Sequence, residues 1–304
     1  MYVRIIPMAT IEGDEMILQQ TKNLKLFKKE IGQVNHFLIT ILVGLDSVWD
    51  GKANKKESFS TSWEPKNIKT SAERSAQYAR KATLAWIVES IEMYLRLSNE
   101  EPRLLSDPII QGKFDSFGRS VYKQAMEASE YYNVGNIQRG FMDLTICWRN
   151  NLVHYKADNQ IIDVSKSILE ESSEMIFQSY SGLDIFRMLE SYKKKNVPTF
   201  KEVASMVKAS IEFITELDSI MISKLDQIEY IDSIFINYIK SNKISRMNNI
   251  FSKDEQTKLQ KLRNILREYG YDETVDETID EFVYTISKYN YSTADSKFTS
   301  GSFT

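Results

Sequence analysis

The chain has 304 residues and a formal net charge of −3, with 42% hydrophobic and 27% charged residues. These values are those of an ordinary soluble protein, and the slightly acidic balance argues against a general nucleic-acid coat, which relies on a dense basic surface. A single cysteine excludes an intramolecular disulfide framework and suits a reducing compartment.

Turn-forming residues are sparse, with 11 Gly and 5 Pro, which favours long helices over many short strands. We therefore predict an all-α chain in four segments. Residues 1–16 are expected to be extended, residues 17–197 to form a helical domain, residues 198–290 to form a C-terminal helical region, and residues 291–304 to be a disordered Ser/Thr-rich tail.

No signal peptide is evident at the start of the sequence. The most apolar stretch, Phe37 to Leu45, is about half as long as a helix needs to be to span a bilayer. We accordingly expect a cytoplasmic protein without a membrane partner.

In the first half of the chain, hydrophobic periodicity predicts a helix from about Ile17 to Trp49 and a second one from about Ser71, after a polar loop. Asp107-Pro108 predicts the start of another helix, which Gly112 and Gly118 are expected to interrupt. A further helix should follow the turn at residues 133–135, with one apolar face formed by Phe141, Leu144, Trp148 and Leu152.

In the second half, Asn196-Val-Pro198 is the best interior boundary, because the residue before a proline disfavours helix. Thr199 and Glu202 then form a capping box for a helix with a heptad-like apolar seam. Another capping sequence begins at Ser252, and Gly270 is expected to end the helix that follows it.

The chemistry concentrates at the end of the helix predicted after residue 135. Residues 149–154 read Arg-Asn-x-x-x-His, and the chain has only two histidines. The guanidinium of Arg149 can hold a phosphate with several donors in a fixed fork. The imidazole of His154 can move a proton near neutral pH. Together they are a minimum set for breaking a phosphodiester without a metal.

The spacing of the two side chains poses a geometric problem. Five residues along an α-helix correspond to about 140° of net rotation and about 7.5 Å of rise, so Arg149 and His154 would not share a face of one straight helix. Two solutions stay open at this point. The helix bends or ends between them, or a second copy of the chain completes the site.

A second Arg-Asn dipeptide shows which part of the motif is informative. Arg263-Asn264 repeats the first half but has Glu268 at the position that would correspond to the histidine. Arg-Asn alone therefore carries no signal in this chain, and the histidine does.

At Arg149, Asn150 and His154 the sequence resembles the HEPN superfamily, whose motif is Arg, four to six residues with a polar one directly after the Arg, then His. Many members are endoribonucleases of toxin–antitoxin, abortive-infection and other phage-defence systems. The resemblance implies a HEPN-like helical bundle with additional C-terminal helices. It also implies a homodimer with a composite active site, although it does not cover the C-terminal third of the chain.

The function implied is metal-independent RNA cleavage, with tRNA as one candidate substrate and an antitoxin or regulatory protein as a further partner. Arg149 and His154 would be catalytic and Asn150 would orient the phosphate or the imidazole. Tyr155 and Lys156 would contact the substrate. The resemblance also makes Glu89, on an earlier helix, a candidate for orienting the motif.

The sequence leaves several alternatives open. The motif could belong to a non-catalytic HEPN-like module that binds nucleotide, nucleic acid or a protein, and Arg149 could form a structural salt bridge with Asp143 or Glu89. The lysines at 193–195 are more readily interpreted as a solvated face or loop than as an RNA contact.

The remaining reactive side chains have simpler interpretations. Cys147 is expected in the core, and His36 is expected to be at least partly buried. We expect no cofactor, because no Gly-rich phosphate loop and no Cys/His cluster occurs. A magnesium site made of carboxylates alone stays open, although no paired-acid motif points to one.

Overall fold

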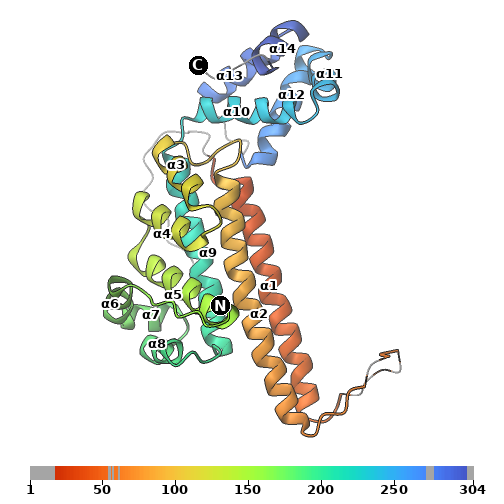
Figure 1. The fold of residues 1–304 in the computed structure, drawn as a ribbon. Helices are drawn as coiled ribbons and strands as arrows, with labels where there is room; N and C mark the ends of the chain where they lie inside the picture. The colour runs from red at the N-terminus through yellow and green to blue at the C-terminus, as the bar shows by residue number, and fades with distance from the viewer. Residues whose placement is uncertain (1–17, 54–55, 57, 61, 272–276, 300–304) are drawn as a thin grey trace. The chain divides into compact units, whose positions relative to one another are not determined.

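A computed structural model describes residues 18–53, 56, 58–60, 62–271 and 277–299. Every regular element in these residues is a helix, which confirms the all-α prediction (Figure 1). The chain divides into two compact units. One spans Asn23–Ser223, and the other combines the residues from Lys224 onward with those up to Lys22.

The first unit contains the predicted motif. Its helices are α1 (Lys22–Trp49), α2 (Ile68–Ser98), α3 (Pro108–Phe117), α4 (Val121–Tyr131), α5 (Asn136–Val153), α6 (Asp163–Glu171), α7 (Ser173–Ser179), α8 (Ile185–Lys193) and α9 (Phe200–Ser223).

Helix α5 is the central element of this unit and packs against α2, α4, α6 and α9. Every residue from Gly140 to Trp148 is buried, so its middle is covered all round rather than on one stripe. The predicted apolar face is there, with Phe141, Leu144 and Trp148 all at 0% exposure. Gly140 allows α6 to approach closely, because a Cβ at this position would lie 3.0 Å from the Leu169 side chain. A helix held on four sides gives its C-terminal end a rigid base.

Helix α9 begins with the capping box that the sequence predicts. The backbone N–H of Thr199 donates to Glu202 Oε2 at 2.6 Å, and the N–H of Glu202 donates to Thr199 Oγ1 at 3.3 Å. The buried Asp218 then accepts a hydrogen bond from the hydroxyl of Tyr94 on α2 at 2.8 Å. A buried carboxylate needs such a partner, so this bond ties α9 to α2 at a defined register.

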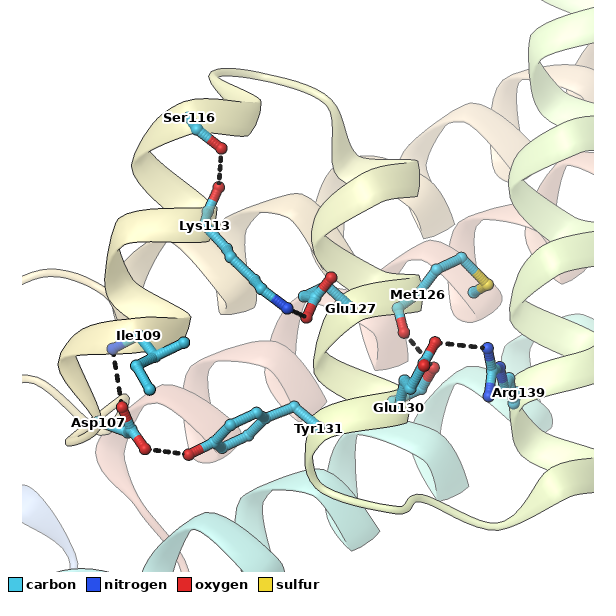
Figure 2. A network of polar contacts seen from close by, with 10 residues as sticks. Asp107, Ile109, Lys113, Ser116, Met126, Glu127, Glu130, Tyr131 and Arg139 are labelled. Atoms are coloured by element: carbon cyan, nitrogen blue, oxygen red, sulfur yellow. Dashed lines mark hydrogen bonds and ion pairs between the residues drawn. The ribbon is translucent and has the colours of Figure 1, made fainter.

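Polar contacts join α3, α4 and the start of α5 (Figure 2). Asp107 caps α3, and Lys113 of α3 pairs with Glu127 of α4. Glu130 of α4 in turn pairs with Arg139 of α5 at 3.2 Å. Gly118 interrupts the helical run as predicted, whereas Gly112 lies inside α3. These contacts fix the N-terminal half of α5, at the opposite end from the motif.

Helices α1 and α2 form a long pair side by side (Figure 1). The first half of α1 is buried at five positions from Leu24 to Leu38, while its second half exposes apolar side chains that include Phe37, Ile41 and Val43. A groove of about 530 Å³ runs between the two helices. By length and composition α1 is apolar enough to cross a membrane, the one such helix in the described residues.

The second unit contains α10 (Gln227–Lys240), α11 (Lys243–Phe251), α12 (Glu255–Tyr269), α13 (Glu277–Ser287) and α14 (Tyr291–Thr299). Asp254 rather than Ser252 caps α12, and Gly270 ends it in a left-handed conformation, φ 108°, as the sequence predicts.

The compact units differ from the predicted segments. Helix α9 packs against α2 and α5, so it belongs with the motif although it follows the boundary at residues 196–198. The prediction of a disordered tail is wrong for residues 291–299. These form α14, whose Ala294 and Phe298 are buried against α10 and α11. Residues 1–16 and 300–304 lie outside the described residues.

Candidate functional site

Helix α5 ends between the two motif residues. Its last residue is Val153, and His154 adopts an extended conformation with φ −95° and ψ 128°. The N–H of His154 still donates to the carbonyl of Asn150 at 3.0 Å, so the helical hydrogen bonds continue up to the point where the backbone turns away. The first of the two geometric solutions therefore applies within one chain.

The turn brings the imidazole back to the guanidinium. Arg149 Nη1 and His154 Nε2 lie 3.3 Å apart. Arginine has only donors, so this contact is a hydrogen bond when Nε2 of His154 carries the lone pair. In that tautomer the lone pair is used by the guanidinium, so Nε2 can take a proton from a substrate only after the substrate replaces Arg149 as its partner.

Arg149 is half-buried against α2. Burial lowers the pKa of Arg149 from its ordinary value, and the negative charges of Glu92 and Glu89 oppose that shift. The guanidinium stays charged, since no protein environment readily deprotonates it. Its Nε is buried without a hydrogen-bond partner. Glu89 is the residue that the sequence makes a candidate for orienting the motif, and Glu92, three residues further along the same helix, acts on Arg149 as well.

The structural alternative for Arg149 does not hold within the described part of the chain, where Arg149 forms no ion pair. The carboxylate of Asp143 is fully buried and accepts hydrogen bonds from the N–H of Ile162 at 3.0 Å and from Cys147 Sγ at 3.4 Å. Asp143 thus fastens the segment after the motif to α5. The predicted core position of Cys147 is confirmed, and burial raises the pKa of its thiol.

The two asparagines of the motif have different surroundings. The side chain of Asn150 has no hydrogen-bond partner among the described residues, so its amide remains available to a ligand. Asn151 is engaged instead: its Nδ2 donates to the carbonyl of Asn159 at 2.9 Å, and its Oδ1 accepts from the N–H of Asn159 at 2.7 Å. Asn151 closes the turn of residues 154–159, which we name the motif turn. Nothing in the sequence pattern indicates this role of Asn151.

The motif turn is held from its other side by the end of α8. Tyr192 donates its hydroxyl hydrogen to the carbonyl of Asn159 at 2.5 Å. Trp148 Nε1 donates to the carbonyl of Asn196 at 2.9 Å. Lys195 Nζ lies 2.8 Å from Asp158 Oδ1, and its hydrogen bond and positive charge lower the pKa of that carboxyl group. We name residues 193–195 the lysine turn.

The two predicted substrate contacts lie on the surface of the motif turn. Tyr155 is 92% exposed. Lys156 Nζ lies 5.3 Å from the centre of the Tyr155 ring, within the range of a cation–π contact. Lys156 has φ 60°, a left-handed conformation that costs a non-glycine residue energy and reflects how tightly the turn closes.

The second histidine lies apart from this site. His36 is exposed on α1, so the expectation that it would be at least partly buried is wrong. The buried residues of α1 lie between Leu24 and Leu38, and His36 is not among them. No group of three or more His, Cys, Asp or Glu residues that could hold a metal ion occurs in the described parts of the chain.

The structure therefore brings Arg149 and His154 into contact, leaves Asn150 available beside them, and places Tyr155 and Lys156 on the next turn. Comparison of the chain with protein-family models, with curated proteins and with solved structures finds no match. The interpretation of the site consequently depends on its own geometry and on the resemblance of its hexapeptide.

Proposed function

We propose that this protein is a metal-independent endoribonuclease of the HEPN type. The observation that carries the proposal is the 3.3 Å contact between Arg149 and His154 at the exposed end of a rigidly held helix. This contact places a fixed phosphate-binding cation beside a group that can transfer protons at neutral pH.

The chemistry follows from the two side chains. His154 takes the proton from a ribose 2′-hydroxyl, whose oxygen attacks the adjacent phosphorus, or supplies a proton to the departing 5′-oxygen. Arg149 stabilises the negative charge that builds on the phosphate oxygens. Asn150 orients the phosphate or the imidazole through its available amide. The products are a 2′,3′-cyclic phosphate and a 5′-hydroxyl end.

The resemblance supplies the setting of this activity, that of a toxin or anti-phage effector. The same source suggests a homodimer with a composite site. Within one chain Arg149 already reaches His154, so a second copy would add substrate contacts or regulation rather than bring the pair together. Partner proteins that hold such an enzyme inactive belong to the same proposal.

The test is cleavage of RNA in the absence of metal. Purified protein is incubated with total RNA and with tRNA in EDTA, beside the His154→Ala variant. Cleavage by the wild type alone, with cyclic-phosphate ends, is the expected result. Glu268→Ala is the matched control, because it removes the residue at the equivalent spacing in the other Arg-Asn segment.

Three other results would contradict the proposal. Equal cleavage by the wild type and by His154→Ala would remove the role assigned to His154. Cleavage that EDTA abolishes would indicate a metal-dependent reaction. Binding of RNA by a folded wild-type protein that leaves the RNA intact would favour a non-catalytic module.

A further inference from the structure

The lysine turn and the motif turn form one continuous surface. Residues 192–196 are joined to residues 157–159 by the hydrogen bond from Tyr192 and by both contacts of Lys195, one to Asp158 and one to the carbonyl of Ala157 at 3.3 Å. These bonds link residues 33 to 38 positions apart in the chain. The lysines at 193–195, for which the sequence favours a solvated face or loop over an RNA contact, therefore lie beside the turn that begins at His154.

The lysines of this surface differ in whether they form ion pairs with neighbouring carboxylates. Lys194 pairs with Glu190 at 2.6 Å, and Lys195 pairs with Asp158 at 2.8 Å. Lys193 and Lys156 are exposed and form no ion pair with a described residue. One cation in each turn thus remains without an ion pair and can contact the phosphates of a bound strand.

Tyr155 adds an aromatic platform to the same surface. With 92% of its surface exposed, its ring contributes little to packing. The ammonium group of Lys156 lies over the ring at 5.3 Å from its centre, and the side chain of Tyr155 is nevertheless almost fully exposed. Proteins bind single-stranded nucleic acid with exposed aromatic rings next to cations that form no ion pair. The ring stacks on a base and the cations contact phosphates.

We propose that the motif turn and the lysine turn together bind single-stranded RNA beside the scissile phosphate. Lys156 and Lys193 contact backbone phosphates, and an unpaired base stacks on Tyr155. A duplex could offer the lysines its backbone but could not offer Tyr155 a free base. This inference rests on the proposed function, because only that function assigns RNA to the end of α5. It goes further by naming the strand type and Lys193.

The test measures binding separately from cleavage. All variants are made in the His154→Ala protein, and the affinity for a labelled single-stranded oligoribonucleotide is measured by fluorescence anisotropy at several salt concentrations. Lys193→Ala should weaken binding severalfold and reduce the slope of log K against log salt by about 0.7, the loss of one single-strand phosphate contact. Lys194→Ala carries the same charge change at the next position and should leave both quantities unchanged, because Lys194 is paired with Glu190.

Tyr155 provides a second, independent comparison. Tyr155→Ala should weaken binding about 5- to 150-fold, the range expected for the loss of one stacked base. Tyr155→Phe should bind like the parent, since stacking needs the ring and not the hydroxyl. The duplex of the same sequence should bind more weakly than the single strand. Because Tyr155 is exposed, neither variant should change the unfolding temperature.

Several results would overturn the inference. These are equal effects of Lys193→Ala and Lys194→Ala, equal effects of Tyr155→Ala and Tyr155→Phe, a duplex that binds as tightly as the single strand, or no measurable binding of the oligoribonucleotide. The expected binding pattern in a protein whose wild type cleaves no RNA would uphold the surface and refute the nuclease. Cleavage without that pattern would do the reverse.

Discussion

The two Arg-Asn dipeptides of this chain differ in what the backbone does after them. Helix α5 ends four residues beyond Arg149, and the extended His154 returns to the guanidinium. Helix α12 continues past Glu268 to Tyr269, so Glu268 stays about 140° around the helix from Arg263. The same dipeptide and the same spacing thus give contact in one helix and separation in the other.

The two arginines are also used differently. Arg263 Nη2 pairs with Asp280 Oδ1 of α13 at 3.1 Å, which joins two neighbouring helices. Arg149 forms no ion pair in the described residues, and its guanidinium lies 3.3 Å from the imidazole. An arginine committed to a carboxylate cannot hold a phosphate without breaking that pair, whereas Arg149 can. The Arg-Asn dipeptide therefore does not distinguish a candidate site from a structural contact, whereas the end of the helix after it does.

The largest expected effect is that of His154→Ala. Removing the imidazole should lower RNA cleavage about 10²- to 10⁴-fold, the usual contribution of a general acid or base. Glu268→Ala, its counterpart in α12, should cleave like the wild type. Initial cleavage rates at equal protein concentration provide the measurement. A similar loss in both variants would mean that the histidine has no special role.

Arg149→Ala should follow, with a loss of about 10²- to 10³-fold in kcat, as expected for a group that stabilises charge in the transition state. Arg149→Lys keeps the charge but not the fork of donors, so it should recover only part of the rate. Arg263→Ala should leave the rate unchanged and cost about 0–1 kcal/mol of stability, because its ion pair is partly exposed. Full activity in Arg149→Lys would show that the fork is unnecessary.

Asn151→Ala tests whether the motif turn must be fastened. The substitution removes the hydrogen bonds that Asn151 makes with Asn159 and should lower the free energy of unfolding by about 1–3 kcal/mol. We expect kcat to fall as well, because His154 begins the turn. Asn264→Ala, which removes an exposed asparagine from α12, should change stability by less than about 0.5 kcal/mol. Urea unfolding and kcat are measured on both variants.

If Asn151→Ala lost stability but kept the wild-type kcat at a temperature where it is folded, the turn would not need Asn151 to position the imidazole. The reverse result, a lower kcat at unchanged stability, would place Asn151 at the substrate instead.

The smallest effect concerns the ion pair between Asp158 and Lys195. Lys195 lowers the pKa of Asp158, so the pair stabilises the folded chain above the unfolded-state pKa of about 4 and loses that contribution as the pH falls through the lowered value. Asp158→Asn should therefore unfold at a slightly lower temperature than the wild type at pH of about 7, and at the same temperature at pH of about 2. Thermal unfolding of both proteins across this range provides the measurement. A difference that persists in acid would contradict the assignment.

Local features of the sequence predicted much of the fold. Hydrophobic periodicity located the long helices, and the capping box at Thr199 and Glu202 and the glycine at 270 marked helix ends where the structure has them. Composition was misleading for residues 291–299, where Ser and Thr suggested disorder although Ala294 and Phe298 pack into the second unit. A few well-placed apolar residues outweigh the average polarity of such a segment.

The candidate site was predictable in part. Arg149, Asn150 and His154 were identifiable by residue type and spacing, and the resemblance assigned their roles. The influence of Glu92 on Arg149, the hydrogen bonds of Asn151 and the position of the lysine turn were not, because each depends on which segments lie next to the end of α5. The exposure of His36 could not be predicted either, because periodicity shows which face of a helix is apolar but not whether another element covers that face.

The sequence by itself determined that the chain is helical, where several helices begin or end, and which residues could carry chemistry. These properties depend on interactions within a few residues, such as backbone hydrogen bonds, caps and side-chain spacing. The tertiary structure alone decided that α5 ends at Val153 and that His154 returns to Arg149. It also decided that the lysine turn lies against the motif turn. These arrangements depend on contacts between segments far apart in the chain. The free energy of such contacts cannot be read from a few neighbouring residues.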